Sequence, residues 1–251
     1  MSGHSHWSGI KHKKAANDAK RGKVWSKIAR TIIVAAKNGG PDPSANLALR
    51  YAIDKAKQAN MPKDTIEKAI SKGAGGGDSV SFETVIYEGY ATGGVAVMAE
   101  ALTDNRNRTG PEIRKIFERH GGSLGSTGCV NYFFSKKGLI TVSLKAVDED
   151  NLMEIALSAG ADDLQNTGQI FEITCEPSAY ENLRKALDEK HIPVELAELT
   201  MIPANTIPIN DLKHAQKILS LMDEFEEHDD VQNVYANFDI PDDIIAKIQQ
   251  T

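Results

Sequence analysis

The fold class is decided by residues 139–200, which read LITVSLKAVDEDNLMEIALSAGADDLQNTGQIFEITCEPSAYENLRKALDEKHIPVELAELT. Short apolar runs alternate in this stretch with segments of helical periodicity. In chain order the predicted elements are strand 139–144, helix 149–159, strands 163–166 and 170–175, helix 178–190 and strand 194–200. The order β-α-β-β-α-β is typical of a ferredoxin-like α+β domain, which we assign to residues 136–204.

The segments on both sides of this domain indicate a second α+β domain that the first one interrupts. They predict a hairpin of strands 84–90 and 95–102, helix 111–120, strand 130–134, and then helix 211–227 and strand 231–238. The last two elements suit completion of the sheet that the hairpin begins. We therefore expect a discontinuous domain, residues 80–135 plus 205–251, with the ferredoxin-like domain inserted in it.

The N-terminal part of the chain is expected to be helical. Apolar residues recur at helical spacing over 22–38, a second helix is predicted over 47–59, and Pro62 suits the first turn of a third. Glycines at 73–77 end the third helix. The sequence thus predicts an α+β multidomain protein that opens with a three-helix bundle, residues 1–76, whose charged arm, residues 1–23, is expected to order only on contact with a partner.

The charge of the chain is divided very unevenly. Residues 1–76 contain 15 Lys and Arg against 5 Asp and Glu, a net charge of +10, whereas residues 77–251 contain 14 against 30, a net charge of −16. A basic N-terminal domain on an acidic body points to a polyanion, nucleic acid above all, as the partner of that domain.

The first predicted helix concentrates this positive charge on one face. On a helical wheel Lys20, Lys23, Lys27, Arg30 and Lys37 share one stripe, which we call the basic stripe. Nearly opposite lie Val24, Trp25, Ile28, Ile32 and Ala35, which should pack the bundle. A solvated or membrane-surface helix is the alternative. It is disfavoured because no acid interrupts residues 20–37 and because the bundle needs the apolar face.

Cations of the arm and the helix together form a candidate site for phosphate oxygens. Its residues are Lys11, Lys13, Lys14, Lys20, Arg21, Lys23, Lys27 and Arg30. If about six phosphates are engaged, affinity should fall with salt at a log-log slope of roughly −4 to −5. No helix-turn-helix, zinc finger or aromatic RNA-binding motif is evident, so we expect recognition of backbone and shape rather than of base sequence.

A second candidate lies in residues 103–109, TDNRNRT, interpreted as a loop between a strand and a helix that starts near Pro111. Arg106 and Arg108 offer planar donors, and the N–H groups of a helix start favour anions. An ordinary turn with solvated arginines is an equally open interpretation.

Other chemistry finds little support in the sequence. No nucleophile–base or paired-carboxylate pattern stands out, so we expect no enzyme, no catalytic residues, no cofactor and no small-molecule substrate. The glycine-rich segment 121–128 lacks the GK[ST] ending of a nucleotide loop. Neither the histidines at 4, 6 and 12 nor the acids at 223–230 are expected to hold a metal.

Cys129 and Cys175 fit reduced, mostly buried thiols. No apolar run could span a membrane and no secretion signal is present, so a soluble cytoplasmic protein without a membrane partner is expected.

Several motifs together resemble the YebC family, to which a mitochondrial translational activator of cytochrome c oxidase also belongs. They are, in order, GHSHW..IKHKKA..DAKRGK, GGPDP..N, NMPKDTIEKAI.KG, YEGY..GGVAV..EALTDNRNRT and DDVQNVY.N.DI. They cover nearly the whole chain. Departures are small; one is His6, where lysine is usual.

The resemblance implies three domains and a non-enzymatic role in gene expression. Family members are described as DNA-binding transcriptional regulators, while others act in translation by binding the ribosome and aiding synthesis through proline-rich stretches. It therefore implies DNA or ribosomal RNA as partner, held by the basic arm and helix together with Arg106 and Arg108. The acidic body slightly favours the ribosome, because it could meet basic ribosomal proteins.

Overall fold

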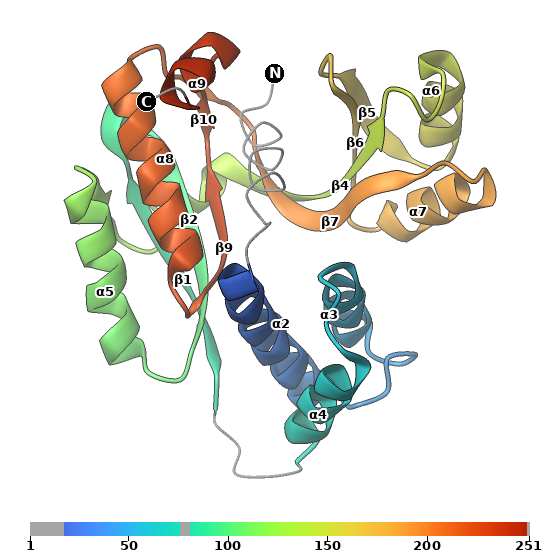
Figure 1. Cartoon of the computed structure of the whole chain (residues 1–251), viewed down its shortest axis with the longest axis horizontal. Coiled ribbons are helices and arrows are strands. Elements are labelled where there is room, and N and C mark those ends of the chain that lie inside the picture. Colours follow the sequence, from blue (N-terminus) through green and yellow to red (C-terminus); the bar gives the residue numbers. More distant parts are fainter. Residues whose placement is uncertain (1–17, 76–80, 250–251) are drawn as a thin grey trace. The chain divides into compact units, whose positions relative to one another are not determined.

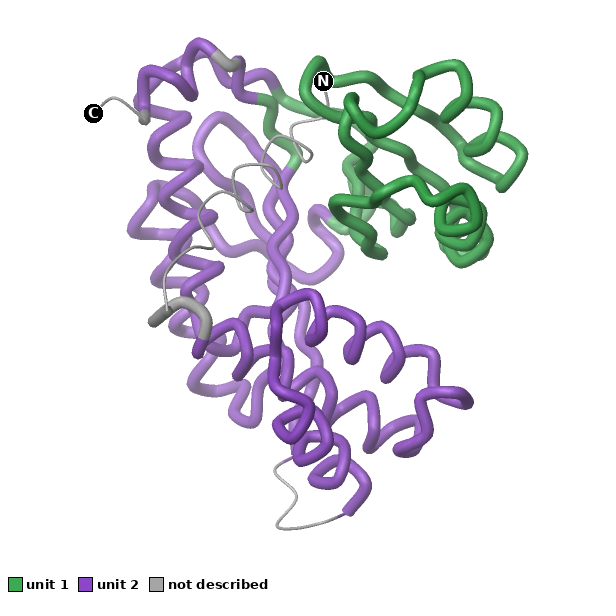
Figure 2. Tube along the Cα trace, turned by 45° about the vertical axis from the view of Figure 1, so that its right-hand side comes forward, with its two compact units in different colours: residues 1–7, 131–207, 237–239 green, residues 8–130, 208–236, 240–251 purple. Residues whose placement is uncertain are grey.

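The computed structural model describes residues 18–75 and 81–249. By their internal contacts the described residues form two units (Figure 2). The smaller contains residues 131–207 and 237–239, and the larger contains the other described residues. Because the chain leaves the larger unit after Val130 and returns to it at Pro208, the prediction that one α+β region interrupts another is confirmed.

Three helices open the larger unit: α2 (Asp18–Gly39), α3 (Leu47–Gln58) and α4 (Lys63–Gly73), as Figure 1 shows. They share a core that contains Ile28 and Ile32 of α2 with Leu49 of α3, all of them buried. The predicted bundle is therefore confirmed, as is the apolar face of its first helix, with one exception.

That exception is Val24, which we expected in the bundle core and whose surface is 44% exposed. The start of the helix was also misplaced, because residues 18–23, assigned to an arm that orders on contact, already belong to α2. Once a helix is nucleated, each added residue gains a hydrogen bond, and Gly22 alone is too weak a break to stop it.

Asn46 joins the first two helices. Its side-chain Oδ1 accepts a hydrogen bond from the N–H of Leu49, which caps the N-terminus of α3, and its Nδ2 donates to the carbonyls of Ala35 and Gly40, both at 2.8 Å. The side chain is buried and serves three backbone groups across the turn. Asn46 therefore fixes the end of α2 against the start of α3.

Replacing Asn46 by alanine is expected to destabilise the helical part by about 1–2 kcal/mol, because the cap and two bonds to carbonyls are removed together. Both tryptophans of the chain, Trp7 and Trp25, belong to residues 1–76, so denaturation followed by tryptophan fluorescence reports on this part. Asn38→Ala, at an exposed position near the end of α2, is the matched control. Equal midpoints for the two variants would contradict the prediction.

The sheet of the larger unit has the strand order β3-β1-β2-β9. Its strands are β1 (Glu83–Tyr90), β2 (Ala96–Thr103), β3 (Ser123–Leu124) and β9 (Val231–Ala236). Strands β1 and β2 form the predicted antiparallel hairpin, and β9 pairs antiparallel with β2. The strand predicted near the C-terminus thus completes the first sheet, as expected.

Two helices, α5 (Arg106–Arg119) and α8 (Leu212–Glu227), pack on this sheet and on each other (Figure 1). The buried rings of Phe117 and Phe225 meet edge to face, with centroids 5.0 Å apart. Such aromatic pairs prefer this geometry. The C-terminal end of α8 therefore has a fixed position beside α5, and the residues that follow it lead into β9.

The smaller unit is the predicted ferredoxin-like fold. Its elements are β4 (Phe134–Ser143), α6 (Glu149–Ser158), β5 (Ala161–Asn166), β6 (Ile170–Cys175), α7 (Tyr180–Glu189) and β7 (Val194–Pro203). Their strand order, β5-β6-β4-β7, places the first and third strands of the motif at the centre. At Gly138 a side chain would collide with Cys175 and Tyr180, so this close packing of α7 on the sheet requires glycine.

Two further predictions of elements were wrong. The expected strand 130–134 does not exist: Asn131–Phe133 forms a 3-10 turn, and one long strand, β4, starts at Phe134, includes residues 139–143 of the predicted strand 139–144 and ends at Ser143. Helix α5 begins at Arg106, before the expected start near Pro111, because the side chain of Asn105 caps it. One short α-helix and three short strands of the described residues were not predicted: α9 (Asp242–Gln249), β3 (Ser123–Leu124), and β8 (Ile207–Pro208) paired with β10 (Phe238–Asp239).

Candidate nucleic-acid interface

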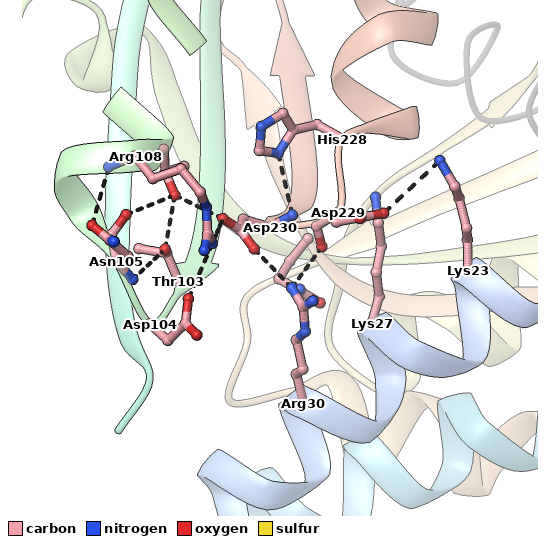
Figure 3. Close-up of polar contacts among 12 residues, drawn as sticks. Lys23, Lys27, Arg30, Thr103, Asp104, Asn105, Arg108, His228, Asp229 and Asp230 are labelled. Atoms are coloured by element: carbon pink, nitrogen blue, oxygen red, sulfur yellow. Dashed lines mark hydrogen bonds and ion pairs between the residues drawn. The ribbon is translucent and has the colours of Figure 1, made fainter. Parts of the chain in front are cut away.

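One face of α2 packs the bundle, and the opposite face carries the basic stripe. Trp25 lies at the edge of the packed face, where its indole Nε1 donates a hydrogen bond of 2.9 Å to the carbonyl of Ala59. This bond and the buried isoleucines fix the rotation of α2. As a result the middle of the stripe, Lys23, Lys27 and Arg30, points toward the C-terminal end of α8 and the residues that follow it (Figure 3).

These three cations contact residues 226–230, which we call the acidic segment. Lys23 Nζ donates to the carbonyl of Glu227 at 3.2 Å and Lys27 Nζ to that of Glu226 at 2.5 Å. Arg30 donates to the carbonyl of Asp229 at 2.9 Å. The last carbonyls of a helix have no partner within the helix and carry partial negative charge, which attracts cations. The end of α8 therefore presents oxygen acceptors with partial negative charge to the stripe, and the phosphate groups of a nucleic acid would present acceptors of the same kind.

The carboxylate of Asp230 joins the two regions that the sequence singled out. Its Oδ1 accepts a bond of 2.9 Å from Arg30, and its Oδ2 accepts bonds of 2.6 Å from Arg108 and 2.7 Å from Thr109 (Figure 3). The side chain of Asp230 is only 5% exposed. Arg30 and Arg108, distant in sequence, thus lie on either side of one buried carboxylate.

The charge state of Asp230 follows from these contacts. Burial raises its pKa, but hydrogen bonds from Arg108 and Thr109 and the positive charges of Arg108 and Arg30 outweigh burial and hold the pKa below its ordinary value. Asp230 is therefore ionised at neutral pH. Its negative charge compensates part of the positive charge that the two arginines bring to this surface.

Arg108 is held from the start of α5. The backbone N–H of Arg108 donates to Asn105 Oδ1, and its guanidinium also pairs with Asp104 at 3.0 Å. At the same helix start, the hydroxyl groups of Thr103 and Thr109 form a hydrogen bond, with 2.8 Å between their oxygens. The predicted phosphate loop is therefore the capped first turn of a helix, while Arg108 keeps a side chain that is 44% exposed.

The other predicted site residues are placed as follows. Arg106 lies exposed in the first turn of α5. Lys20 and Arg21 belong to α2, although their side chains lie outside the described part. The residues Lys11, Lys13 and Lys14 lie outside the described residues altogether.

Sequence reasoning missed the role of Asp230. The acids at 223–230 were interpreted as a solvated helix end rather than as a metal site, whereas Asp230 pairs with two arginines and Glu224 pairs with Arg119 and His120. Within residues 18–75 and 81–249 no cluster of three or more His, Cys, Asp or Glu is arranged to hold a metal. The role of Asp230 could have been inferred from the DDVQNVY motif, because an aspartate directly before an apolar strand is poorly placed for solvation.

The glycine-rich segment 121–128 has an internal carboxylate where a nucleotide loop would hold phosphate. Glu88 is 3% exposed, and its two carboxylate oxygens accept hydrogen bonds from the N–H groups of Gly128, at 2.6 Å, and Val130, at 2.8 Å. Burial raises the pKa of the neighbouring Cys129 thiol, which disfavours the reactive thiolate. The loop is thus a structural turn fastened by Glu88.

Replacing Glu88 by glutamine is expected to destabilise the larger unit by about 1–2 kcal/mol, because the amide can accept only one of the two N–H bonds. The loosened loop should also expose Cys129, so the rate of thiol labelling is measured alongside chemical denaturation. Glu83→Gln, at an exposed position of the same strand, is the control and should leave both readouts unchanged.

No helix in the described residues is long and apolar enough to cross a membrane.

Comparison with known proteins shows similarity along the whole chain. The family model described as the TACO1/YebC protein N-terminal domain matches residues 5–76, and the model described as the TACO1/YebC second and third domain matches residues 82–238. A probable transcriptional regulatory protein of Dictyoglomus thermophilum is 52% identical, over 99% of this chain and 100% of that protein. A probable transcriptional regulatory protein of Geobacter sulfurreducens is 53% identical, over 99% of this chain and 100% of that protein. The crystal structure of a conserved hypothetical protein from Aquifex aeolicus matches with a TM-score of 0.84 at 51% identity, covering 94% of this chain and 98% of that one.

Proposed function

Because the chain belongs to the TACO1/YebC family, many of whose members are named probable transcriptional regulatory proteins, we propose that it is a DNA-binding regulator of transcription without catalytic activity. In this proposal residues 1–76 hold the sugar-phosphate backbone.

The observation that carries the proposal is the meeting of Arg30 and Arg108 at Asp230. Arg30 of the basic stripe and Arg108 of α5 lie on either side of this carboxylate, which supports a single interface made of the two basic segments (Figure 3). Arg30 is held further by the ring of Phe82, 5.8 Å from its guanidinium carbon. Guanidinium groups that pair with a carboxylate in this way also suit phosphate oxygens, because their planar donors match both kinds of anion.

The remaining residues of the proposed interface are cations of the arm and of α2. They are Lys11, Lys13, Lys14, Lys20, Arg21, Lys23 and Lys27, with Arg106 beside Arg108. No element with a base-reading pattern accompanies them, which supports recognition of the backbone rather than of base sequence.

A second candidate function is binding to the ribosome as a translation factor that aids synthesis of proline-rich stretches. The observation that favours it is the net charge of −16 on residues 77–251. Such an acidic body is repelled by free duplex DNA, but it complements the basic proteins of a ribosome while the basic stripe meets ribosomal RNA.

Two measurements test these proposals. In the first, fluorescently labelled duplex DNA and a ribosomal RNA fragment are titrated with the full chain at several salt concentrations, with an expected log-log slope of roughly −4 to −5 for the preferred partner. Absence of binding to both at low salt refutes a nucleic-acid function. In the second, sucrose-gradient sedimentation at physiological salt separates the candidates: migration with ribosomes favours translation, and binding to duplex DNA in the first measurement without co-migration favours transcription.

A further inference from the structure

The acidic segment and the proposed nucleic acid require the same donors. Within the described part of the chain, Lys23, Lys27 and Arg30 all direct their terminal nitrogens at carbonyl or carboxylate oxygens of residues 226–230. Lys23 Nζ also lies 3.9 Å from the carboxylate of Asp229. A phosphate that approaches these nitrogens meets acceptors already in place.

The local charge points the same way. The acidic segment carries four carboxylates, at 226, 227, 229 and 230, and four cations of the described residues contact it, the three of the stripe and Arg108. With the segment in place the positive charge of this part of the stripe is therefore balanced, and a polyanion gains little by approaching it. With α2 released from the segment, the three cations of the stripe become available and each can neutralise a phosphate and release a counterion.

The contacts also show which of the two partners, the acidic segment or α2, can move away from the other. Asp230 is fastened to its own sheet and helix: its carbonyl accepts a bond of 2.7 Å from the N–H of Leu102, and its carboxylate holds Arg108 and Thr109. Toward α2, Arg30, which pairs with the carboxylate of Asp230, has a side chain that is 27% exposed, and the ion pair of Lys23 with Asp229 joins side chains that are 57% and 69% exposed. Exposed pairs of this kind are weak and screened by salt, so α2 is the partner that can leave.

We propose that the acidic segment, residues 226–230, is an intramolecular competitor for nucleic acid, which occupies Lys23, Lys27 and Arg30 in the free protein and from which α2 separates when a phosphate backbone binds. This inference rests on the proposed function of the basic stripe and adds its regulation. The chain then has a closed form, with weak affinity for nucleic acid, and an open form with high affinity.

A cross-link that can be cut again tests the competition within one protein. Thr31 of α2 and Gln232 of β9 meet beside the stripe, with their side-chain oxygens 3.2 Å apart, and neither is a cation of the stripe. In a chain with Cys129→Ser, the substitutions Thr31→Cys and Gln232→Cys are joined by a short bis-maleimide that contains a cleavable disulfide. Affinity for labelled duplex DNA and ribosomal RNA is measured before and after reduction, with closure verified by mass spectrometry.

The linked chain is expected to bind roughly tenfold more weakly than the same chain after cleavage, because about three cations are then withheld from phosphates. The uncleaved Thr31→Cys single variant, treated with the same reagent, controls for modification alone. Equal affinity of the linked and cleaved forms overturns the competition but leaves the proposed function intact. Absence of binding in every form, wild type included, overturns the proposed function and the competition together.

An independent variant addresses the charge of the segment. Asp229→Asn, in full-length chain that is otherwise wild type, is expected to tighten binding by roughly threefold, because it removes an acid next to Lys23. Asp188→Asn removes the same charge at an exposed position of the smaller unit and should have no such effect. Equal effects of both substitutions would show that the net charge of the chain explains the change in affinity, and would overturn a specific role of the acidic segment.

Discussion

Simultaneous replacement of Lys13, Lys14, Lys23 and Lys27 by alanine is expected to weaken binding to nucleic acid by about a hundredfold at moderate salt, uniformly across sequences. Each lysine that binds a phosphate contributes counterion release rather than base recognition, so specificity should not change. The log-log salt slope should become shallower by about one unit for each phosphate that the variant no longer neutralises. Fluorescence anisotropy with several unrelated duplexes and RNA fragments, over a range of salt, measures both quantities.

A matched set of substitutions separates this interface from the net charge of the chain. Lys136, Lys145, Lys185 and Lys190 are exposed lysines of the smaller unit, and their replacement by alanine removes the same four charges. This control should leave the salt slope unchanged. If the first variant keeps the wild-type slope, or the control lowers it equally, the stripe and arm are not the interface.

Most of the fold could be predicted from the sequence, and the reason differs between elements. In the ferredoxin-like region each helix and each strand has its own segment of helical or alternating hydrophobic periodicity, and turn residues separate these segments, so both helices and all four strands were predicted. The start of the first strand was the exception. The residues before Gly138 that lie in β4, Phe134 to Lys137, include two lysines and no alternating apolar pattern, and the strand is stabilised there by pairing with β7. Pairing between distant segments leaves no local signal.

The start of α5 shows the same limit. Gly110 and Pro111 predict a helix boundary, because proline lacks the N–H that a helix interior uses. In the structure Asn105 Oδ1 and the hydroxyl groups of Thr103 and Thr109 form a network that starts the helix earlier. Thr109 of this network also donates to Asp230, which is distant in sequence. The cap by Asn105 is a local signal that the glycine and proline outweighed in the prediction, whereas the contact with Asp230 leaves no local pattern.

For the candidate site, the sequence predicted which residues are basic but not what they contact. Helical spacing correctly placed Lys23, Lys27 and Arg30 on one stripe opposite the core of the bundle. The spacing carries no information about residues 226–230, which reach the stripe through the packing of α8 and β9. The acids that contact the stripe lie about 200 residues further along the chain. Their charge was visible in the sequence, while their partner was not.

Replacement of Asp230 by asparagine is expected to lower the free energy of unfolding by about 2–3 kcal/mol. Removal of one partner from a buried ion pair typically costs about 3–5 kcal/mol, and the cost here is smaller because the side chains of Arg30 and Arg108 are 27% and 44% exposed and can regain water. Denaturation of the full chain in urea at pH 7 measures the change. Asp229→Asn, at a side chain that is 69% exposed, is the control and should change stability by less than about 0.5 kcal/mol.

The pH dependence of that difference identifies its origin. The pKa of Asp230 is lower in the folded chain than its ordinary value of 3.8, because hydrogen bonds and charge from Arg108 and Arg30 outweigh burial. A carboxyl group of this kind stabilises the fold fully above the pKa of the unfolded chain, and the contribution disappears as the pH falls through the folded pKa. The gap in stability between wild type and Asp230→Asn should therefore stay constant from about pH 7 to pH 5 and narrow below about pH 4, where the protonated wild-type side chain resembles the amide. A gap that persists unchanged in acid would show that asparagine disturbs packing rather than charge, and the carboxylate would then not be what holds the two arginines together.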